Sequence, residues 1–203
     1  MLEIKNLTVK VKNDAPILTD VSLSIDEGTC IGLTGASGSG KTTLIKSIMG
    51  MNGGDLEIPQ GQILLDGDNL LTHSAKERRM LCGKTIGFIP QNPMTAFFPH
   101  AKMERQIIET LRMHTGLDKK QAHALAENVL CQVNLTDTKR VLSAYPGELS
   151  GGMLQRIAMA LILGTKPKYV LADEPTSALD EANRDLLLEL LSCLLYTSPS
   201  PRD

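Results

Sequence analysis

A glycine-rich segment of the chain has residue types and spacing that are suited to binding phosphate. It has the form Gly-x-x-x-x-Gly-Lys-Thr, and its glycines allow several backbone N–H groups to converge on phosphate oxygens. A helix that starts at Lys41 would add the positive end of its dipole. Lys41 is expected to contact the β- and γ-phosphates of a nucleotide and to stabilise charge during attack, and the hydroxyl of Thr42 to bind Mg²⁺. A simple glycine-rich turn before a helix is the weaker alternative. The predicted nucleotide-binding residues are Gly35, Ala36, Ser37, Gly38, Ser39, Gly40, Lys41, Thr42 and Thr43.

An acidic pair, Asp173 and Glu174, follows a short apolar segment that is typical of a buried strand. A carboxylate at such a strand end can hold Mg²⁺ through water, so Asp173 is predicted to bind metal. Glu174 can orient and polarise an attacking water, which makes it our catalytic candidate. The alternative is that the pair only caps a helix.

The phosphate-binding segment requires a strand before it and a helix after it, and the sequence predicts both. The apolar run at residues 30–34 predicts a buried parallel strand, in which Cys30 would be a core residue. Residues 41–49 have a helical pattern. Alternation of apolar and polar residues at 2–11 and 21–25 predicts two half-buried strands of an antiparallel sheet.

The remaining elements follow from the same periodicities. Further strands are expected within 55–69, with a tight turn, at 86–90, where Pro90 ends the strand, and at 168–172. Helical spacing runs from 103 to 135, with a break near Gly116, and again at 151–163 and 181–191.

Composition excludes several classes of protein. The chain has 203 residues, 42% of them hydrophobic, which is enough for a sizeable core. Its 21 basic and 23 acidic residues show no polybasic signature, so nucleic acid is not an expected partner. We find no signal peptide and no apolar stretch long enough to cross a bilayer, so membrane contact would come through another protein. The cysteines form no CxxC, and the histidines, which lack metal-ligand spacing, are interpreted as surface or loop residues: His73, His100, His114 and His123.

The motifs taken together resemble those of ATP-binding cassette ATPases, and the resemblance covers the chain from about residue 1 to about residue 191. It rests on the order of the phosphate loop, Gln91, Leu149-Ser150-Gly151-Gly152, Asp173-Glu174 and Ser177-Ala178-Leu179-Asp180. It implies an α/β fold: a P-loop NTPase core with a mainly parallel sheet, an N-terminal antiparallel β subdomain and an inserted α-helical subdomain. The core would comprise residues 1–92 and 165–192, and the helical subdomain residues 93–164.

The resemblance also assigns roles to residues whose chemistry alone is ambiguous. Ser150, Gly151 and Gly152 would bind the γ-phosphate held by a second subunit, although Ser150 could equally be an ordinary N-cap. Gln91 would contact Mg²⁺ or the attacking water and relay motion to a membrane partner. Asp180 would contact the opposite subunit. The implied cofactors are ATP and Mg²⁺.

The forms of two motifs, Gln91-Asn92-Pro93 and Ser150-Gly151-Gly152-Met153-Leu154-Gln155-Arg156, are similar to the subgroup that energises import of dipeptides, oligopeptides or nickel. Such subunits work as homo- or heterodimers beneath integral-membrane permeases, with an extracytoplasmic solute-binding protein. The implied location is the cytoplasmic face of a bacterial or archaeal plasma membrane. The alternatives are a non-transport cassette ATPase and an ATP-binding regulatory module with little turnover.

Two departures from the family pattern stand out. No aromatic residue is present at 9–12 to stack on adenine, so Val11 is the expected apolar contact. No histidine follows His123, whereas the family places one against the γ-phosphate. Residues 193–203 resemble the translation of a sequencing adapter, so we expect a non-native tail there and a C-terminally truncated cassette with impaired hydrolysis.

Overall fold

The computed structural model describes residues 1–175. These residues belong to two compact units, the first from Met1 to Cys82 and the second beginning at Gly83. Asp180, the expected helix at 181–191 and the expected non-native tail at 193–203 lie outside the described residues.

The first unit contains an antiparallel sheet with the strand order β2-β1-β3-β4. On β1, the side chains of Leu2, Ile4, Leu7 and Val9 are almost fully buried. The predicted antiparallel subdomain is therefore confirmed, although β2 starts earlier than residue 21. The strands are β1 (Leu2–Val11), β2 (Pro16–Ile25), β3 (Leu56–Leu65) and β4 (Asp68–Asn69).

A bulge interrupts the pairing of β1 with β3 and requires glycine. Gly61 has φ +112°, and a Cβ there would lie 2.5 Å from the backbone Cα of Leu7. Any side chain would therefore both strain the backbone and clash with the neighbouring strand.

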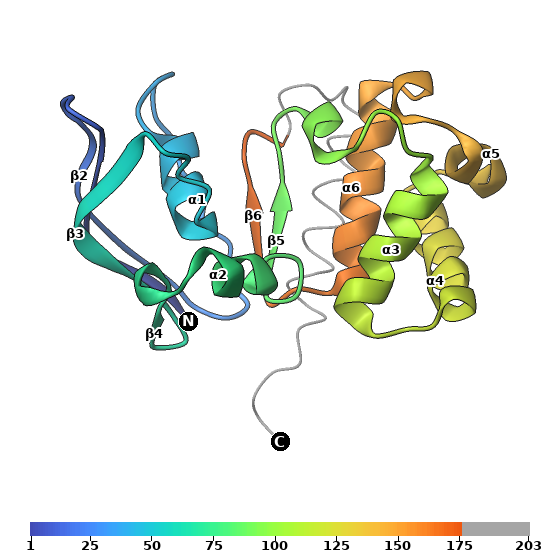
Figure 1. The fold of residues 1–203 in the computed structure, drawn as a ribbon, viewed down its shortest axis with the longest axis horizontal. Helices are drawn as coiled ribbons and strands as arrows, with labels where there is room; N and C mark the ends of the chain where they lie inside the picture. Colours follow the sequence, from blue (N-terminus) through green and yellow to red (C-terminus); the bar gives the residue numbers. More distant parts are fainter. Residues whose placement is uncertain (176–203) are drawn as a thin grey trace. The chain divides into compact units, whose positions relative to one another are not determined.

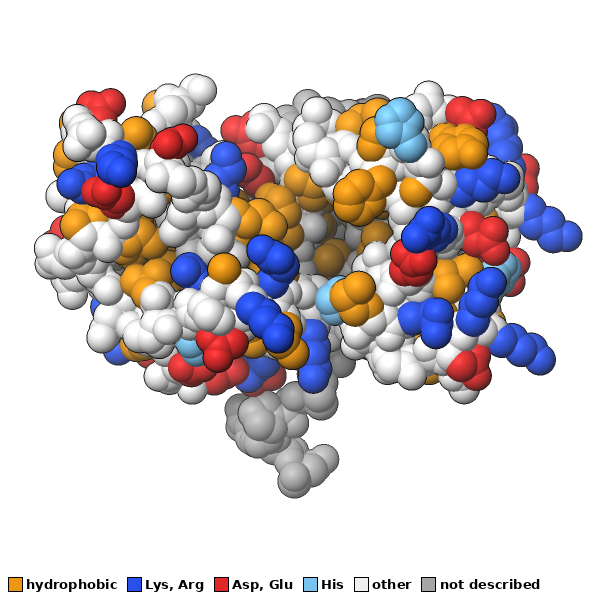
Figure 2. Space-filling view, viewed as in Figure 1, with side chains coloured by type: hydrophobic (Ala, Val, Ile, Leu, Met, Phe, Trp, Pro, Cys, Tyr) orange, Lys and Arg blue, Asp and Glu red, His pale blue; other side chains and the backbone are white. Residues whose placement is uncertain are grey.

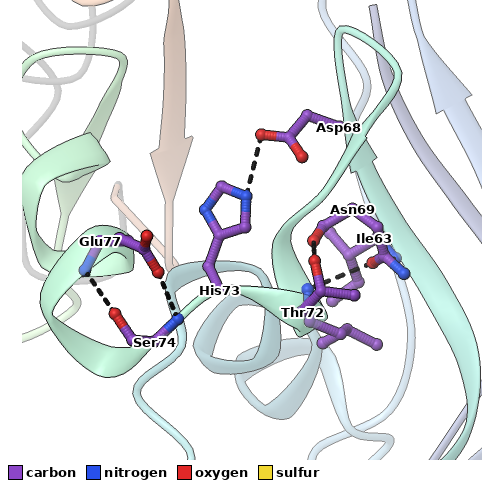
Figure 3. A network of polar contacts seen from close by, with 8 residues as sticks. Ile63, Asp68, Asn69, Thr72, His73, Ser74 and Glu77 are labelled. Atoms are coloured by element: carbon purple, nitrogen blue, oxygen red, sulfur yellow. Dashed lines mark hydrogen bonds and ion pairs between the residues drawn. The ribbon is translucent and has the colours of Figure 1, made fainter.

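The helices of the first unit follow their local signals. Helix α1 occupies the residues that the sequence predicts, buries Leu44, Ile45 and Ile48, and ends at Gly50 with φ 69°. Figure 3 shows the polar contacts around the turn before α2, where Ser74 and Glu77 form a reciprocal capping box and His73 Nε2 lies 2.9 Å from Asp68 Oδ2. The helical segments are α1 (Lys41–Met49), the 3₁₀ helix η1 (Leu70–Thr72) and α2 (Ala75–Leu81).

The expected buried strand at 30–34 is not formed. No described strand pairs with this segment, and Cys30, Ile31 and Leu33 are exposed, the last two by 44% and 45%. The prediction that Cys30 is a core residue was therefore wrong in this structure. A parallel strand depends on hydrogen bonds from neighbours that are distant in sequence, so an apolar run cannot establish one by itself.

The second unit contains a parallel pair of strands, β5 and β6, whose register runs from Ile86 opposite Tyr169 to Ile89 opposite Ala172. Helix α6 (Gly151–Thr165) packs closely on β5, as Figure 1 shows. Gly87 makes this approach possible, because a Cβ there would lie 2.5 Å from Ile162 Cδ1. The strands are β5 (Ile86–Ile89) and β6 (Tyr169–Ala172).

Three helices, α3, α4 and α6, enclose the core of the second unit. The predicted break between the first two is confirmed at Gly116, where φ is 75°. Figure 2 shows basic and acidic side chains intermixed on the outer side of this helical region. The helical segments are η2 (Pro93–Ala96), α3 (Met103–Thr115), α4 (Lys119–Gln132), α5 (Thr138–Ser143), η3 (Pro146–Glu148) and α6 (Gly151–Thr165).

The histidines are less uniform than expected. His100 is exposed in a loop, but His114 and His123 lie in helices and are half-buried. Among residues 1–175, no group of three or more His, Cys, Asp or Glu side chains could hold a metal ion.

Candidate nucleotide-binding and catalytic site

The predicted phosphate loop is an exposed turn directly before α1, in the first unit. Gly40 is the residue before the helix and has φ 90°, and a Cβ at this position would lie 2.6 Å from Leu18 Cδ2. Gly38 also has a positive φ, of 80°. Backbone conformation and packing therefore both favour glycine at Gly40, and conformation alone favours it at Gly38.

The basic side chain of this loop lies against the loop's own backbone. Lys41 Nζ donates hydrogen bonds to the carbonyl oxygens of Gly35 and Ala36, at 2.8 and 3.0 Å. Thr42 and Thr43 follow in the first turn of α1 and are half-buried. The loop thus gathers a cation, hydroxyl groups and the backbone N–H groups of exposed residues at one helix N-terminus, which is an arrangement that binds phosphate.

In the second unit, the carboxyl ends of β5 and β6 lie side by side because the strands are parallel and in register. The N–H of Asp173 donates to the carbonyl of Ile89 at 3.0 Å, and the Asp173 side chain is only 6% exposed. Just beyond, Gln91 Nε2 donates to Glu174 Oε2 at 2.6 Å. The structure therefore brings together two residues that the sequence predicted separately.

Glu174 has an unusual backbone conformation, with φ 44°. A non-glycine residue in this left-handed region costs about 1–2 kcal/mol. Such strain persists only where surrounding contacts hold it. Glu174 is an exposed residue.

Gln155, on α6, is a residue of this site that the sequence prediction missed as a functional candidate. Its side chain is only 1% exposed, and its Nε2 donates to the carbonyl of Pro175, the residue after Glu174. One signal could have revealed it: Gln155 is a polar residue that precedes the apolar residues Ala158, Met159 and Ile162 by three, four and seven positions, a spacing that puts it on the buried face of α6.

The signature segment forms the N-terminus of α6. Ser150 is the N-cap, and its Oγ accepts a hydrogen bond from the backbone N–H of Met153 at 3.3 Å. The ordinary capping role is thus present in the structure. Ser150 and Gly151 are both exposed, so this helix end is open to an anion from outside the chain.

The predicted site residues therefore form two groups. The phosphate loop with Lys41 and Thr42 belongs to the first unit, whereas Gln91, Ser150 and Asp173, with the residues beside them, belong to the second. Asp180 lies beyond the described residues.

Comparison with known proteins agrees with these features. A family model described as "ABC transporter" matches residues 18–177. The metal-staphylopine import system ATP-binding protein CntD of Staphylococcus aureus (strain Mu50 / ATCC 700699) is 38% identical over 93% of this chain and 70% of its own length. The dipeptide transport ATP-binding protein DppD of Lactococcus lactis subsp. cremoris (strain MG1363) is 35% identical, over 95% of this chain and 56% of its own length. The oligopeptide transport ATP-binding protein OppD of Haemophilus influenzae (strain ATCC 51907 / DSM 11121 / KW20 / Rd) is 34% identical over 95% and 60%.

Solved structures show the same fold. The dimeric bacterial ABC transporter cassette MJ0796 has a TM-score of 0.84 at 26% identity, over 97% of this chain and 83% of that chain. A dimeric post-hydrolysis state of the same cassette, bound to ADP and Pi, has a TM-score of 0.83 at 27% identity, over 96% and 83%.

Within residues 1–175, no helix is both long and apolar enough to cross a membrane. The phosphate loop, the strand-end carboxylates and the signature helix agree with the family match, which covers most of the chain. The chain belongs to the ABC transporter family, as an ATP-binding cassette ATPase.

Proposed function

We propose that this cassette is the ATP-hydrolysing subunit of an importer for peptides or metal complexes. The observation that carries the proposal is the contact between Gln91 and Glu174 at the ends of β5 and β6. A carboxylate held at a defined orientation can accept a proton from water as the water attacks the γ-phosphate.

The other described groups supply binding and charge stabilisation. The N-terminus of α1 and Lys41 would hold the phosphates and neutralise charge that develops during transfer. Ser150 and the following glycines, at the N-terminus of α6, would bind the γ-phosphate of a second cassette. Asp180 and Val11 stay predicted contacts to the second subunit and to adenine.

The proposed metal is Mg²⁺, because three predicted residues each offer an oxygen ligand of the kind that it prefers. Thr42 offers a hydroxyl, Gln91 an amide oxygen and Asp173 a buried carboxylate, and all of these are hard oxygen ligands. When bound, Mg²⁺ would neutralise charge on the β- and γ-phosphates.

The proposed partners are a second cassette, identical or paralogous, and integral-membrane permeases served by a solute-binding protein. Support for the dimer comes from the two similar cassette structures that are described as dimeric. Support for import comes from relatives named for metal-staphylopine, dipeptide and oligopeptide transport. We propose peptides or metal complexes as cargo, and nickel is one candidate among the metals.

The assignment of Glu174 is tested by the substitution Glu174→Gln, which keeps the shape of the side chain and removes its basicity. ATP turnover should fall by about 10²–10⁴-fold, while the affinity for ATP stays within about twofold. Glu109→Gln is the matched control, because Glu109 is an exposed glutamate on α3 that pairs with Arg105. Turnover near the unsubstituted rate in Glu174→Gln would refute the catalytic assignment.

The transport function is tested in the source cell. Deletion of the gene should abolish ATP-dependent uptake of a labelled dipeptide or of a chelated metal. Uptake should return with the original gene but not with the gene that encodes Glu174→Gln. Unchanged uptake of every solute tested after deletion would contradict a role in import.

A further inference from the structure

We propose that Gln155 is a positioning residue for ATP hydrolysis, which acts by holding the backbone turn that carries Glu174. The proposal rests on the function proposed above, because it presumes that Glu174 orients the attacking water. Gln155 itself would touch neither the nucleotide nor the water.

The hydrogen bond from Gln155 to Pro175 links α6 to the end of β6. Gln155 lies on α6 and is 1% exposed, and its neighbours one turn along the same helix face, Ala158 and Met159, are apolar and buried. A buried amide is unfavourable in such surroundings unless it forms hydrogen bonds. Its Nε2 donates to the carbonyl of Pro175, and within residues 1–175 its Oε1 has no hydrogen-bond partner. The NH₂ group of the Gln155 amide is therefore the part that forms a hydrogen bond in this structure.

The Glu174 backbone adopts a conformation that is disfavoured both for a non-glycine residue and for a residue before proline. Its φ of 44° lies in the left-handed region. In addition, Pro175 follows it, and a residue before proline prefers extended or polyproline conformations. The turn therefore depends on contacts from outside it.

Such contacts exist on both sides of Glu174. Before it, the Asp173 N–H donates to the carbonyl of Ile89 at 3.0 Å, which ties the chain to β5. After it, the Pro175 carbonyl accepts from Gln155. Because proline has no N–H, the carbonyl is the backbone group at this residue that can form such an anchor. With both flanking residues held, the Glu174 side chain starts from a defined position and can meet Gln91 Nε2 at 2.6 Å.

The substitution Gln155→Met tests this role, because methionine is similar in length and volume but cannot donate a strong hydrogen bond. We expect kcat for ATP hydrolysis to fall about tenfold. A tenfold loss in rate corresponds to about 1.4 kcal/mol, which is in the range that one hydrogen bond contributes. The affinity for ATP and the melting temperature should change little. Loss of the hydrogen bond to Pro175 should lower stability. Loss of the buried Oε1, which has no described hydrogen-bond partner, should raise it, so the two effects on stability oppose each other.

The matched control is Gln132→Met on α4, where the amide donates to Asn128 on an exposed helix face. This substitution should leave kcat unchanged. A Gln155→Met variant with kcat within about twofold of the unsubstituted chain would overturn the positioning role and leave the proposed function intact.

A second experiment tests whether Gln155 affects hydrolysis by positioning Glu174 or in a way that does not involve Glu174. If Gln155 acts by positioning Glu174, Gln155→Met should not lower the residual rate of a Glu174→Gln variant any further, because the group it positions is already inactive. An equal further loss in that background would contradict the proposal. If Glu174→Gln alone turns over at the unsubstituted rate, the proposed function fails first.

A third variant covers the case in which Gln155→Met does not fold. In Gln155→Glu, an ionised carboxylate cannot donate to the Pro175 carbonyl, but a protonated carboxyl can, and burial would raise its pKa. The kcat of this variant relative to the unsubstituted chain should therefore rise as the pH falls from about 8 to about 6. A constant ratio across that range would count against the proposal.

Discussion

The Gln91 amide donates a hydrogen bond to the Glu174 carboxylate across 2.6 Å, although 83 residues separate them in the sequence. The contact exists because β5 and β6 are parallel neighbours whose carboxyl ends coincide. It links the segment that leads into the helical region to the residue that we propose orients the attacking water.

Substitution of Gln91 by leucine should slow hydrolysis without weakening nucleotide binding. A hydrogen bond to a charged group contributes about 1.5–3 kcal/mol, which corresponds to a loss in kcat of roughly 10–100-fold if the bond acts only during reaction. Steady-state ATPase assays and binding of a fluorescent ATP analogue would measure the two effects separately. Gln132→Leu on α4 is the control, and a Gln91→Leu variant with altered affinity but normal kcat would contradict this expectation.

Lys41→Met should weaken ATP binding and leave the fold unchanged. In the structure Lys41 contacts the carbonyl oxygens of its own loop, at Gly35 and Ala36, so no buried ion pair is lost. Removal of its charge-assisted bonds to phosphate should raise the Kd for ATP by roughly 10–100-fold. Lys46→Met, at an exposed position on the same helix, is the matched control. Equal affinities for the two variants would show that Lys41 does not contact the nucleotide.

The packing of α3 on α6 predicts that the substitution Gly164→Ala destabilises the unsubstituted chain but stabilises a variant in which Leu111 is replaced by alanine. A Cβ at Gly164 would lie 2.6 Å from Leu111 Cδ2, and Leu111 is fully buried and cannot move freely away. Gly164→Ala should therefore be destabilising by itself, because overpacking costs about 1–3 kcal/mol. Leu111→Ala should cost about 2–5 kcal/mol.

In the Leu111→Ala background the same Gly164→Ala change should become stabilising, because the overlap is gone and alanine favours the helix by about 1 kcal/mol. Chemical denaturation of the single and double variants would measure this cycle. Simple additivity of the two free-energy changes would refute the proposed contact.

Burial lowers the pKa of His114 from its usual 6.5. Its imidazole lies against Gly83, where a Cβ would approach the ring to 2.5 Å. The folded protein therefore binds this proton less readily than the unfolded chain does, so stability decreases as the pH falls below 6.5 and through the lower, folded-state pKa.

The substitution His114→Gln should remove this contribution. Melting temperatures measured between about pH 7.5 and about pH 5 should fall less steeply for the variant than for the unsubstituted chain. His100→Gln, in an exposed loop, should leave the slope unchanged. Parallel slopes for His114→Gln and the unsubstituted chain would exclude His114 as the source.

Features that depend on neighbouring residues were predictable from the sequence. The start of α1 at Lys41, the break at Gly116 and the N-cap at Ser150 all follow from glycine conformations, capping groups and apolar spacing within a few residues. The phosphate loop was recognisable for the same reason. Its chemistry lies in one short segment, and glycine is the residue that adopts the positive φ angles at Gly38 and Gly40 with least strain.

One prediction that depends on strand pairing, the buried strand at 30–34, was wrong. The apolar run around Ile31 predicts a buried strand, yet the segment is unpaired and exposed in the described structure. Apolar residues make a strand possible, but its hydrogen bonds come from partners that are far away in the sequence.

The sequence by itself determined the residue types of the site: a phosphate loop, two strand-end acids, a glutamine and a signature helix. Only the tertiary structure decided which of them meet. The parallel register of β5 and β6 places Gln91 against Glu174, and the packing of α6 brings the Gln155 amide to Pro175. A motif records local conformation and chemistry, whereas these contacts join segments through packing and hydrogen bonds that no local pattern encodes.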